Sequence, residues 1–93
     1  MRIEFDPAKR ATTLDTRGLD MADAGAVFEG DHITVDDIRF EYGEQRYMTI
    51  GLLGGRMVVL AWTARGSARR IISMRKANER ENRKYGPKLG RSG

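Results

Sequence analysis

The chain has 93 residues, 40% of them hydrophobic, and a formal net charge of +4. This length supports a single domain with two packed layers, and the absence of cysteine excludes disulfides, thiol catalysis and thiolate metal sites. No apolar run reaches the roughly 18–20 residues that a membrane span needs, and no basic segment followed by an apolar one opens the chain. We therefore expect a cytoplasmic protein without membrane contact.

Charge is distributed unevenly along the chain. Residues 1–62 hold seven Lys/Arg and eleven Asp/Glu, a net charge of −4, whereas residues 63–93 hold ten and two, a net charge of +8. A basic C-terminal third on an acidic body favours an anionic partner, either a nucleic acid or an acidic protein. A solvated basic helix without a partner is the competing interpretation.

The first 18 residues predict a strand followed by a helix. Residues 2–5 alternate in polarity and could form a short edge strand. Asp6-Pro7 is typical of a helix start, and we expect the helix to run to about Thr16 and to stop at Gly18. Lys9 lies near its start, where the helix dipole disfavours cations. It is therefore either a plain exposed residue or one that faces an anion.

A second helix is predicted from Asp20 to Phe28, because apolar residues recur there at the spacing of one helical face: Met21, Ala24, Val27 and Phe28. Residues 33–42 then alternate as a strand does, with a turn at Asp36-Asp37. His32 is the only histidine, and we expect it to be a structural or solvated loop residue. No His-based triad or metal cluster can be built around it.

Residues 46–65 predict a β-hairpin around Gly54-Gly55, a two-residue turn of the primed type. Pairing across this turn predicts which residues lie opposite each other: Tyr47 and Trp62, Arg46 and Thr63, and Glu44 and Arg65. The last pair brings a carboxylate to a guanidinium at the open end of the hairpin. We expect Trp62 to be a core residue.

The next turn, at Gly66-Ser67, decides which residues of the following strand join Glu44, because a slip of one residue moves every side chain across the sheet. A two-residue turn would add one set: Arg70, Ile72 and Met74. A three-residue turn would add the other: Ile71, Ser73 and Arg75. We favour the three-residue turn, since it leaves Ile72 and Met74 on the apolar face. It groups one polar face: Glu44, Arg46, Thr63, Arg65, Ser73 and Arg75.

A final helix is expected from about Lys76 to Tyr85, where Gly86-Pro87 breaks it. It carries the exposed cations Arg80 and Arg83. Residues 1–86 are then a single domain, and residues 87–93, which have little to bury, are a flexible tail.

The predicted polar face combines cations, one carboxylate and hydroxyls without histidine or cysteine, so it cannot perform Ser-His chemistry. It could support cleavage of RNA without a metal ion or other cofactor, because the substrate's own 2′-hydroxyl is the nucleophile. Glu44 would orient or deprotonate that hydroxyl, while Arg65 and Arg75 would bind phosphate oxygens. An exposed Glu44–Arg65 ion pair, worth about 0–1 kcal/mol, is the plainer alternative.

Four segments, in chain order, resemble the BrnT toxin family: FDPAKR (Phe5–Arg10), EQRYMTIG (Glu44–Gly51), WTARG (Trp62–Gly66) and RIISMRKANERENRKY (Arg70–Tyr85). The resemblance implies an α+β, RelE-like fold in which two N-terminal helices and a C-terminal helix are packed with an antiparallel sheet. It also implies a type II toxin whose endoribonuclease activity blocks translation. Its partner would be a BrnA-like ribbon-helix-helix antitoxin in a 2:2 complex, which contacts operator DNA through the antitoxin.

The chemistry and the resemblance together assign roles to particular residues. The predicted catalytic residues are Glu44, Arg65, Arg75 and Arg80. The predicted RNA-binding residues are the neighbouring cations Lys9, Arg46, Arg70, Lys76 and Arg83. The alternative function is that of a non-catalytic basic module that binds an acidic antitoxin or nucleic acid.

Overall fold

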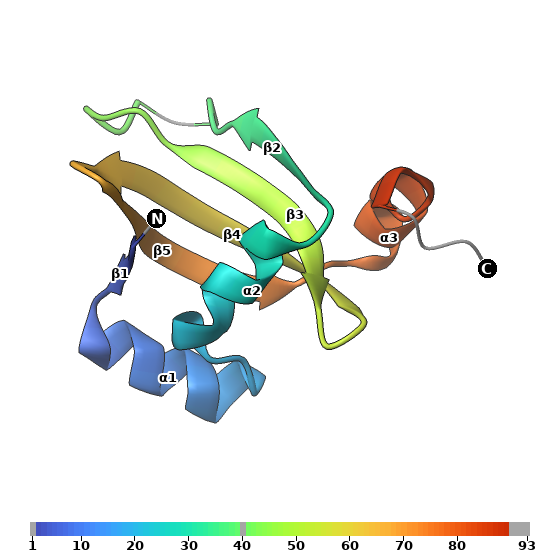
Figure 1. Cartoon of the computed structure of the whole chain (residues 1–93), viewed down its shortest axis with the longest axis horizontal. Helices are drawn as coiled ribbons and strands as arrows, with labels where there is room; N and C mark the ends of the chain where they lie inside the picture. The colour runs from blue at the N-terminus through green and yellow to red at the C-terminus, as the bar shows by residue number, and fades with distance from the viewer. Residues whose placement is uncertain (1, 40, 90–93) are drawn as a thin grey trace.

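The computed structural model of the chain describes residues 2–39 and 41–89 (Figure 1). Five strands form one sheet in the order β1-β5-β4-β3-β2. The strands are β1 (Arg2–Phe5), β2 (His32–Asp36), β3 (Tyr47–Leu53), β4 (Arg56–Arg65) and β5 (Ala68–Lys76). The helices are α1 (Pro7–Arg17), α2 (Ala24–Glu29) and α3 (Glu79–Tyr85), and the 3₁₀ turns are η1 (Met21–Asp23) and η2 (Pro87–Leu89). Within the described residues, no helix is long and apolar enough to cross a membrane.

The predicted α+β class is confirmed by this five-stranded sheet and its three helices. Two details of the predicted arrangement are wrong. β1 confirms the short edge strand predicted over residues 2–5, but it precedes the two helices that the family resemblance placed at the N-terminus. It also pairs with β5 in parallel, so the sheet is mixed rather than antiparallel. Parallel pairing is possible because most of the chain separates β1 from β5, and parallel strands need a long connection.

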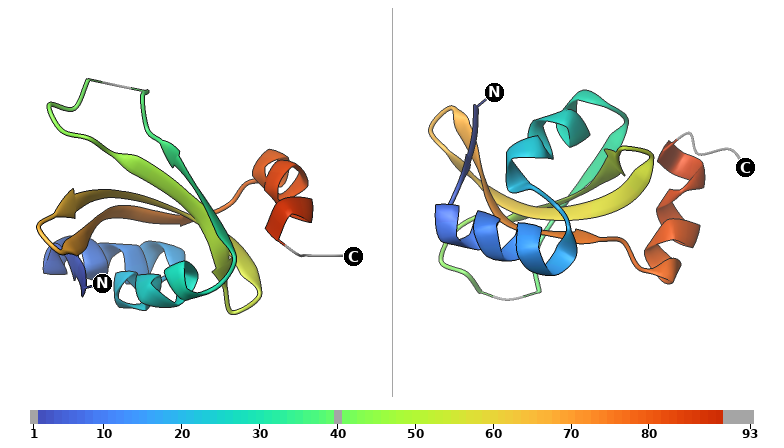
Figure 2. Two further views of the ribbon diagram at one scale, coloured as in Figure 1. Left: turned by 45° about the horizontal axis from the view of Figure 1, so that its top comes forward. Right: turned by 90° about the horizontal axis from the view of Figure 1, so that it is seen from below.

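α1 and α2 cover one face of the sheet, here called the inner face (Figure 2). The main core cluster lies on it and includes Met21, Val27, Val58, Leu60, Ile71 and Met74. Trp62 is 9% exposed in this cluster, and its Nε1 donates to Thr49 Oγ1 over 2.8 Å. The rings of Tyr47 and Phe28 lie 4.7 and 5.5 Å from the Trp62 ring, between centroids. The prediction that Trp62 is a core residue is confirmed.

The opposite face, here called the outer face, has a second and smaller cluster. α3 and η2 cover one end of it, where Leu89 is 2% exposed against Ile50, Met57 and Val59. The sequence places a tail from residue 87, whereas the packing of Leu89 continues the folded structure through η2. Residues 90–93 of that tail lie outside the described residues.

The N-terminal elements form largely as predicted. The Asp6 carboxylate accepts a hydrogen bond from the Ala8 N–H at the start of α1, and Gly18 ends the helix with φ 67°. The second predicted helix is divided into η1 and α2. Asp20 causes this division by capping a tight turn, in which its carboxylate accepts from the Ala22 N–H. The predicted apolar stripe of this segment nevertheless faces the core.

The predicted hairpin register between β3 and β4 is confirmed from Tyr47 opposite Trp62 to Leu53 opposite Arg56. Gly54 and Gly55 have φ of 59° and 78°, which a primed turn requires at both central positions. The described ladder begins at Tyr47, so Glu44 lies beyond its end.

The predicted three-residue turn between β4 and β5 is wrong at the turn and correct farther along the strands. Arg65 pairs with Ala68 across a two-residue turn, in which Gly66 has φ 57°. Beyond Trp62, which pairs with Ile71, the register shifts by one residue at Ile72, so that Ala61 pairs with Ser73. This irregularity returns the strand to the predicted register. Its consequence is that Ile71, rather than Ile72, joins Met74 in the core.

The strand predicted over residues 33–42 is shorter than expected. β2 ends at Asp36, and residues 37–39 and 41–46 lie in a loop at the end of the sheet opposite α3 (Figure 2). Ile38 is 84% exposed, and Phe40 lies outside the described residues. The physical reason is local, because Asp37 forms hydrogen bonds within the loop, and such bonds compete with strand pairing.

Candidate functional site

The outer face carries the polar residues of the central strands. Alternation along β4 and β5 directs Ala61, Thr63, Ser73 and Arg75 away from the core cluster on the inner face. Thr63 is 4% exposed, and its hydroxyl donates to the Gln45 carbonyl oxygen over 2.7 Å. This bond links the segment just before β3 to β4. Three arginine–carboxylate pairs lie around these residues.

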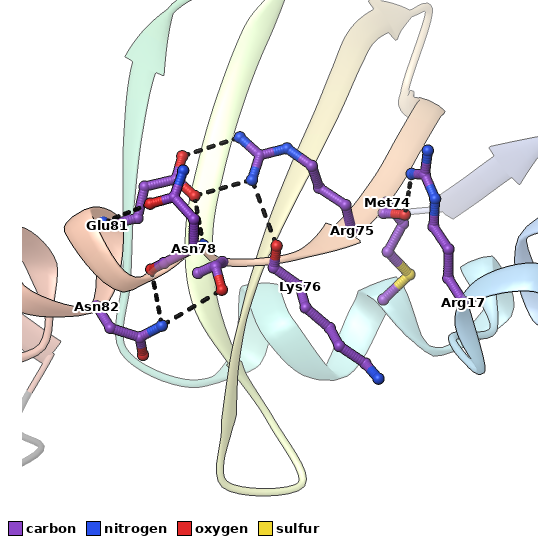
Figure 3. A network of polar contacts seen from close by, with 8 residues as sticks. Arg17, Met74, Arg75, Lys76, Asn78, Glu81 and Asn82 are labelled. Carbon is purple, nitrogen blue, oxygen red and sulfur yellow. Dashed lines mark hydrogen bonds and ion pairs between the residues drawn. The ribbon is translucent and has the colours of Figure 1, made fainter.

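The first pair joins Arg75 to Glu81 (Figure 3). Nη1 and Nη2 of Arg75 donate to the two carboxylate oxygens of Glu81, each over 2.8 Å. Glu81 also accepts from the Asn78 N–H, and Asn78 caps the Glu81 N–H in return, so the same carboxylate completes the capping box of α3. The hydrogen bonds to Arg75 lower the pKa of Glu81, which keeps it ionised and makes it a weak base.

The pKa of Arg75 is raised, first by its hydrogen bonds to Glu81. Burial opposes this effect, and so does the positive charge of Arg39, which belongs to the loop between β2 and β3. The positive charges of the loop and of the end of β5 therefore interact, although three strand spacings separate β2 from β5.

The second pair joins Arg39 to Asp37. Nε and Nη2 of Arg39 donate to the two oxygens of Asp37 over 2.8 and 2.9 Å, and the Tyr42 hydroxyl donates to the same carboxylate over 3.2 Å. The Asp37 side chain is 1% exposed, whereas that of Arg39 is 56% exposed. These hydrogen bonds, the Arg39 bond first, lower the pKa of Asp37 to about 2.

The third pair joins Arg46 to Glu44, with 3.0 Å between Nε and the carboxylate. The Arg46 guanidinium also lies over the Tyr42 ring, 4.0 Å from its centroid. Tyr42 therefore contacts both the second and the third pair. A cavity of about 290 Å³ lies between them and is lined by Asp37, Ile38, Glu41, Tyr42, Glu44, Gln45 and Arg46.

The structure places several predicted site residues on the outer face but at different levels along the strands. Arg46 and Thr63 lie beside Glu44 at the end near the β2–β3 loop, whereas Ser73 and Arg75 pair with Ala61 and Val59, closer to α3. The structure does not join Glu44 to Arg65. Glu44 binds Arg46 instead, and among the described residues no hydrogen bond or ion pair involves Arg65, which is exposed at the end of β4. The reason is that β3 begins only at Tyr47, so the predicted register does not extend to Glu44.

The other predicted cations are dispersed. Arg70 lies 3.7 Å from Glu4 of β1, and Arg83 forms an exposed pair with Glu79 of its own helix. Arg80 is exposed on α3. Lys76 points away from the side on which Arg75 lies (Figure 3).

Lys9 lies on α1, in the helical layer. It lines a cavity of about 340 Å³ between this helix and β5, together with Thr12, Thr16, Arg17 and Ser73. The predicted RNA-binding residues thus do not form one continuous surface with Arg75.

Sequence reasoning missed four residues of this site: Asp37, Arg39, Tyr42 and Glu81. The spacing of Asn78 and Glu81 matches a capping box and could have identified the position of Glu81. For the other three, the sequence signal was misleading, because alternation favoured a strand. His32 is exposed at the start of β2, where Nδ1 lies 2.8 Å from the Gly30 carbonyl oxygen. In the described part of the chain, no group of three or more His, Cys, Asp or Glu could hold a metal ion.

Comparison with known protein families gave one match. Residues 5–81 match the family described as the ribonuclease toxin BrnT of a type II toxin–antitoxin system. The matched span extends from the end of β1 into the first turn of α3 and includes all six residues of the three pairs. The search of curated proteins gave no match.

Proposed function

The chain belongs to the BrnT family of ribonuclease toxins of type II toxin–antitoxin systems, and from this premise we propose that it cleaves RNA on the outer face of its sheet. The observation that carries the proposal is the group of three arginine–carboxylate pairs around Thr63 and Ser73. Arginine in this setting binds phosphate oxygens with fixed geometry and keeps its charge at every physiological pH.

The proposed reaction uses the substrate as its own nucleophile. The 2′-oxygen of one nucleotide attacks the adjacent phosphorus, and the bond from phosphorus to the 5′-oxygen breaks. The 2′-hydroxyl proton passes to a protein base, and the leaving 5′-oxygen takes up a proton from water. The products are a 2′,3′-cyclic phosphate and a 5′-hydroxyl. This route requires neither a protein nucleophile nor a metal ion.

Glu44 is the carboxylate best suited to act as the base. Asp37 is buried, and its pKa of about 2 makes it a poor proton acceptor. Glu81 is bound by both Arg75 and the N-terminus of α3. Glu44 is exposed and has a single ion-pair contact, with Arg46. A substrate hydroxyl can therefore approach it.

Arg75 is the residue best suited to stabilise the charge that develops on the phosphate. A guanidinium has five N–H donors, and the contacts of Arg75 to Glu81 and to the Lys76 carbonyl oxygen leave Nε and part of Nη2 for a ligand. Glu81 holds the guanidinium in one orientation before substrate binds. Such preorganisation makes a charged donor effective in catalysis. Arg65 and Arg80 would supply further positive charge from the edges of the site.

The remaining expectations concern the setting of the reaction. We propose that the toxin acts in the cytoplasm and inhibits translation, and that its fold is of the RelE-like type. The antitoxin partner that a type II toxin implies would be a BrnA-like ribbon-helix-helix protein in a 2:2 complex. It would neutralise the toxin by covering the outer face, and it would provide the contact with operator DNA.

One assay tests the proposed reaction. Purified chain is incubated with RNA in EDTA, and the ends of the products are identified. We expect 2′,3′-cyclic phosphates, and a loss of kcat of about 10²–10³-fold on Arg75→Ala, by analogy with the removal of a preorganised charge-stabilising donor. Glu44→Gln should also reduce kcat.

A binding module without catalysis is the alternative function, and the neutralisation of all three arginines by carboxylates favours it. The same assay distinguishes this binding module from the enzyme. If the wild-type protein cleaves no more than an Arg65→Ala/Arg75→Ala variant, yet still shifts RNA in a gel, the enzyme proposal is wrong and the binding module replaces it.

A further inference from the structure

We propose that Arg39 is a phosphate-binding residue that positions RNA across the outer face, opposite Arg75. The identity of the ligand as RNA rests on the proposed function. The proposal adds a second anchor, on the loop between β2 and β3, to a site that otherwise depends on β5 and α3. Arg39 would act by holding the substrate in place rather than by taking part in bond cleavage.

The first argument is the way in which Arg39 is held. Its Nε and Nη2 engage both oxygens of Asp37, and the Asp37 carboxylate also receives the Arg39 backbone N–H and the Tyr42 hydroxyl. The carboxylate is almost wholly buried, whereas more than half of the Arg39 side chain is exposed. One edge of the guanidinium is therefore fixed by Asp37, Tyr42 also hydrogen-bonds to the Arg39 side chain, and the N–H donors beyond these contacts can bind a ligand.

The second argument is the position of Arg39 relative to Arg75. Asp37, which holds Arg39, directly follows β2, and Arg75 lies on β5. Three interstrand spacings of about 4.8 Å make a lateral span of roughly 14 Å between these strands. The two residues are also offset along the strands, because Asp37 is bonded to Arg46 beyond the Tyr47–Trp62 row, whereas Arg75 pairs with Val59. Met48, Ala61 and Ser73 lie in this span, and none of them is charged. A single extended strand of nucleic acid fits a surface of this width.

The third argument is electrostatic. Arg39 and Arg75 repel each other, since the positive charge of Arg39 acts to lower the pKa of Arg75. Each arginine has its own carboxylate, Asp37 or Glu81, and neither carboxylate is shared. An anion between the two guanidiniums relieves the repulsion, and a phosphodiester is the anion that the proposed substrate provides.

The test compares variants of the full chain in binding a single-stranded RNA whose 2′-hydroxyls are methylated, so that it cannot be cleaved. We expect Arg39→Gln to weaken binding roughly tenfold, as for the loss of one charge-assisted hydrogen-bond group. It should also reduce the slope of log affinity against log salt by about 0.7, the value for one phosphate contact on a single strand. Arg39→Lys should restore the slope, because it restores the charge.

The matched control is Arg56→Gln, which removes one positive charge at an exposed site. Arg56 lies at the start of β4, opposite Leu53 of the inner-face cluster. Equal losses in Arg39→Gln and Arg56→Gln would overturn the proposal, since the effect would then be one of net charge. Binding and slope unchanged in Arg39→Gln would overturn it as well.

A separate control addresses folding, because Arg39→Gln leaves the buried Asp37 without its ion pair. The variant Asp37→Asn/Arg39→Gln replaces the pair with two neutral amides. If it unfolds at the wild-type temperature and shows the same loss of RNA affinity, the role of Arg39 is in binding. A wild-type affinity in this variant would contradict the proposal.

Kinetics on cleavable RNA give a second readout. A positioning residue should raise KM in Arg39→Gln and leave kcat within about threefold, whereas a fall in kcat at constant KM would contradict that role. The proposed function fails separately, if the wild-type chain does not cleave RNA. The salt dependence of binding by Arg39→Gln then still decides whether Arg39 is a phosphate contact.

Discussion

The two faces of the sheet solve the problem of buried polar groups in opposite ways. On the inner face, Trp62 Nε1 and the hydroxyls of Thr49 and Thr34 are uncharged and bind each other, and the Arg69 guanidinium lies over the Phe28 and Trp62 rings, its buried Nε without a hydrogen-bond partner among the described residues. On the outer face, three arginines, Arg39, Arg46 and Arg75, are each matched by a carboxylate. The inner arrangement serves packing, whereas the outer one holds cations in fixed orientations.

This difference predicts that the two faces respond differently to substitution. Removing a large side chain from the inner face creates a cavity, which lowers the free energy of unfolding. Removing one member of an outer pair leaves its partner without a counter-charge and without a fixed orientation. We expect this to affect ligand binding more than folding. The following predictions test that separation.

The largest expected effect is on the inner face. Trp62→Ala should lower the free energy of unfolding by about 3–5 kcal/mol, because the ring fills space between Phe28 and Tyr47. Trp62→Phe should cost less, since it keeps a ring but removes the donor to Thr49. Urea denaturation measures both values. A near-neutral Trp62→Ala would contradict the assignment of this face as the core.

A smaller effect is expected where α3 meets the outer face. Glu81→Ala removes the carboxylate that completes the capping box and binds Arg75, so it should lower the free energy of unfolding by about 0.5–2 kcal/mol. It should also reduce cleavage, because Arg75 is no longer oriented. Glu79→Ala is the matched control, since Glu79 is exposed and pairs only with Arg83, which is worth about 0.2–0.5 kcal/mol. Equal effects of the two changes on kcat would break the link between Glu81 and the site.

The parts of the fold that could be predicted from the sequence are those determined by local chemistry. Asp6 and Gly18 set the ends of α1, and Gly54-Gly55 set the register of the β3–β4 hairpin. These features depend on residues close together in the chain, each with a conformational preference of its own. The sequence also carried the signal for the second turn, since glycine at the first central position of Gly66-Ser67 is typical of a two-residue turn.

The features that could not be predicted depend on contacts between distant segments. The irregularity at Ile72 lets both Ile71 and Met74 face the core, and no periodic pattern distinguishes it from a continuous strand in either register. The parallel pairing of β1 with β5 joins the two ends of the fold. Leu89 packs on Ile50, Met57 and Val59, which holds the segment after α3 on the sheet.

The site could be predicted only in part, because some of its residues depend on contacts that local patterns do not show. Once the register is known, strand alternation places four predicted residues on the outer face: Arg46, Thr63, Ser73 and Arg75. A turn was predicted at Asp36-Asp37, where β2 ends, but the residues after it were assigned to a strand because they alternate in hydrophobicity. Only the buried hydrogen bonds of the Asp37 carboxylate show that the loop folds on itself.

The smallest expected effect concerns the response of one ion pair on each side of the sheet to low pH. The pKa of Asp37 is about 2, lowered first by its hydrogen bond to Arg39, and the pKa of Asp20 is also about 2, lowered first by Arg10 of α1. Both values lie below the value of about 3.9 for an unfolded aspartate. Each pair therefore stabilises the fold fully above about pH 4, and its contribution is lost as the pH falls toward 2.

Asp37→Asn and Asp20→Asn should accordingly both lower the free energy of unfolding at pH 7, and both differences from wild type should shrink between pH 4 and pH 2. Denaturation by urea at several pH values measures this. RNA binding at pH 7 should separate the two variants, because Asp37 holds an arginine beside the proposed substrate path, whereas Asp20 holds one in the helical layer. Asp37→Asn should weaken binding and Asp20→Asn should not. If both variants bound RNA like the wild type, the Asp37–Arg39 pair would be a structural contact on the outer face, equivalent to the Asp20–Arg10 pair beside the inner one.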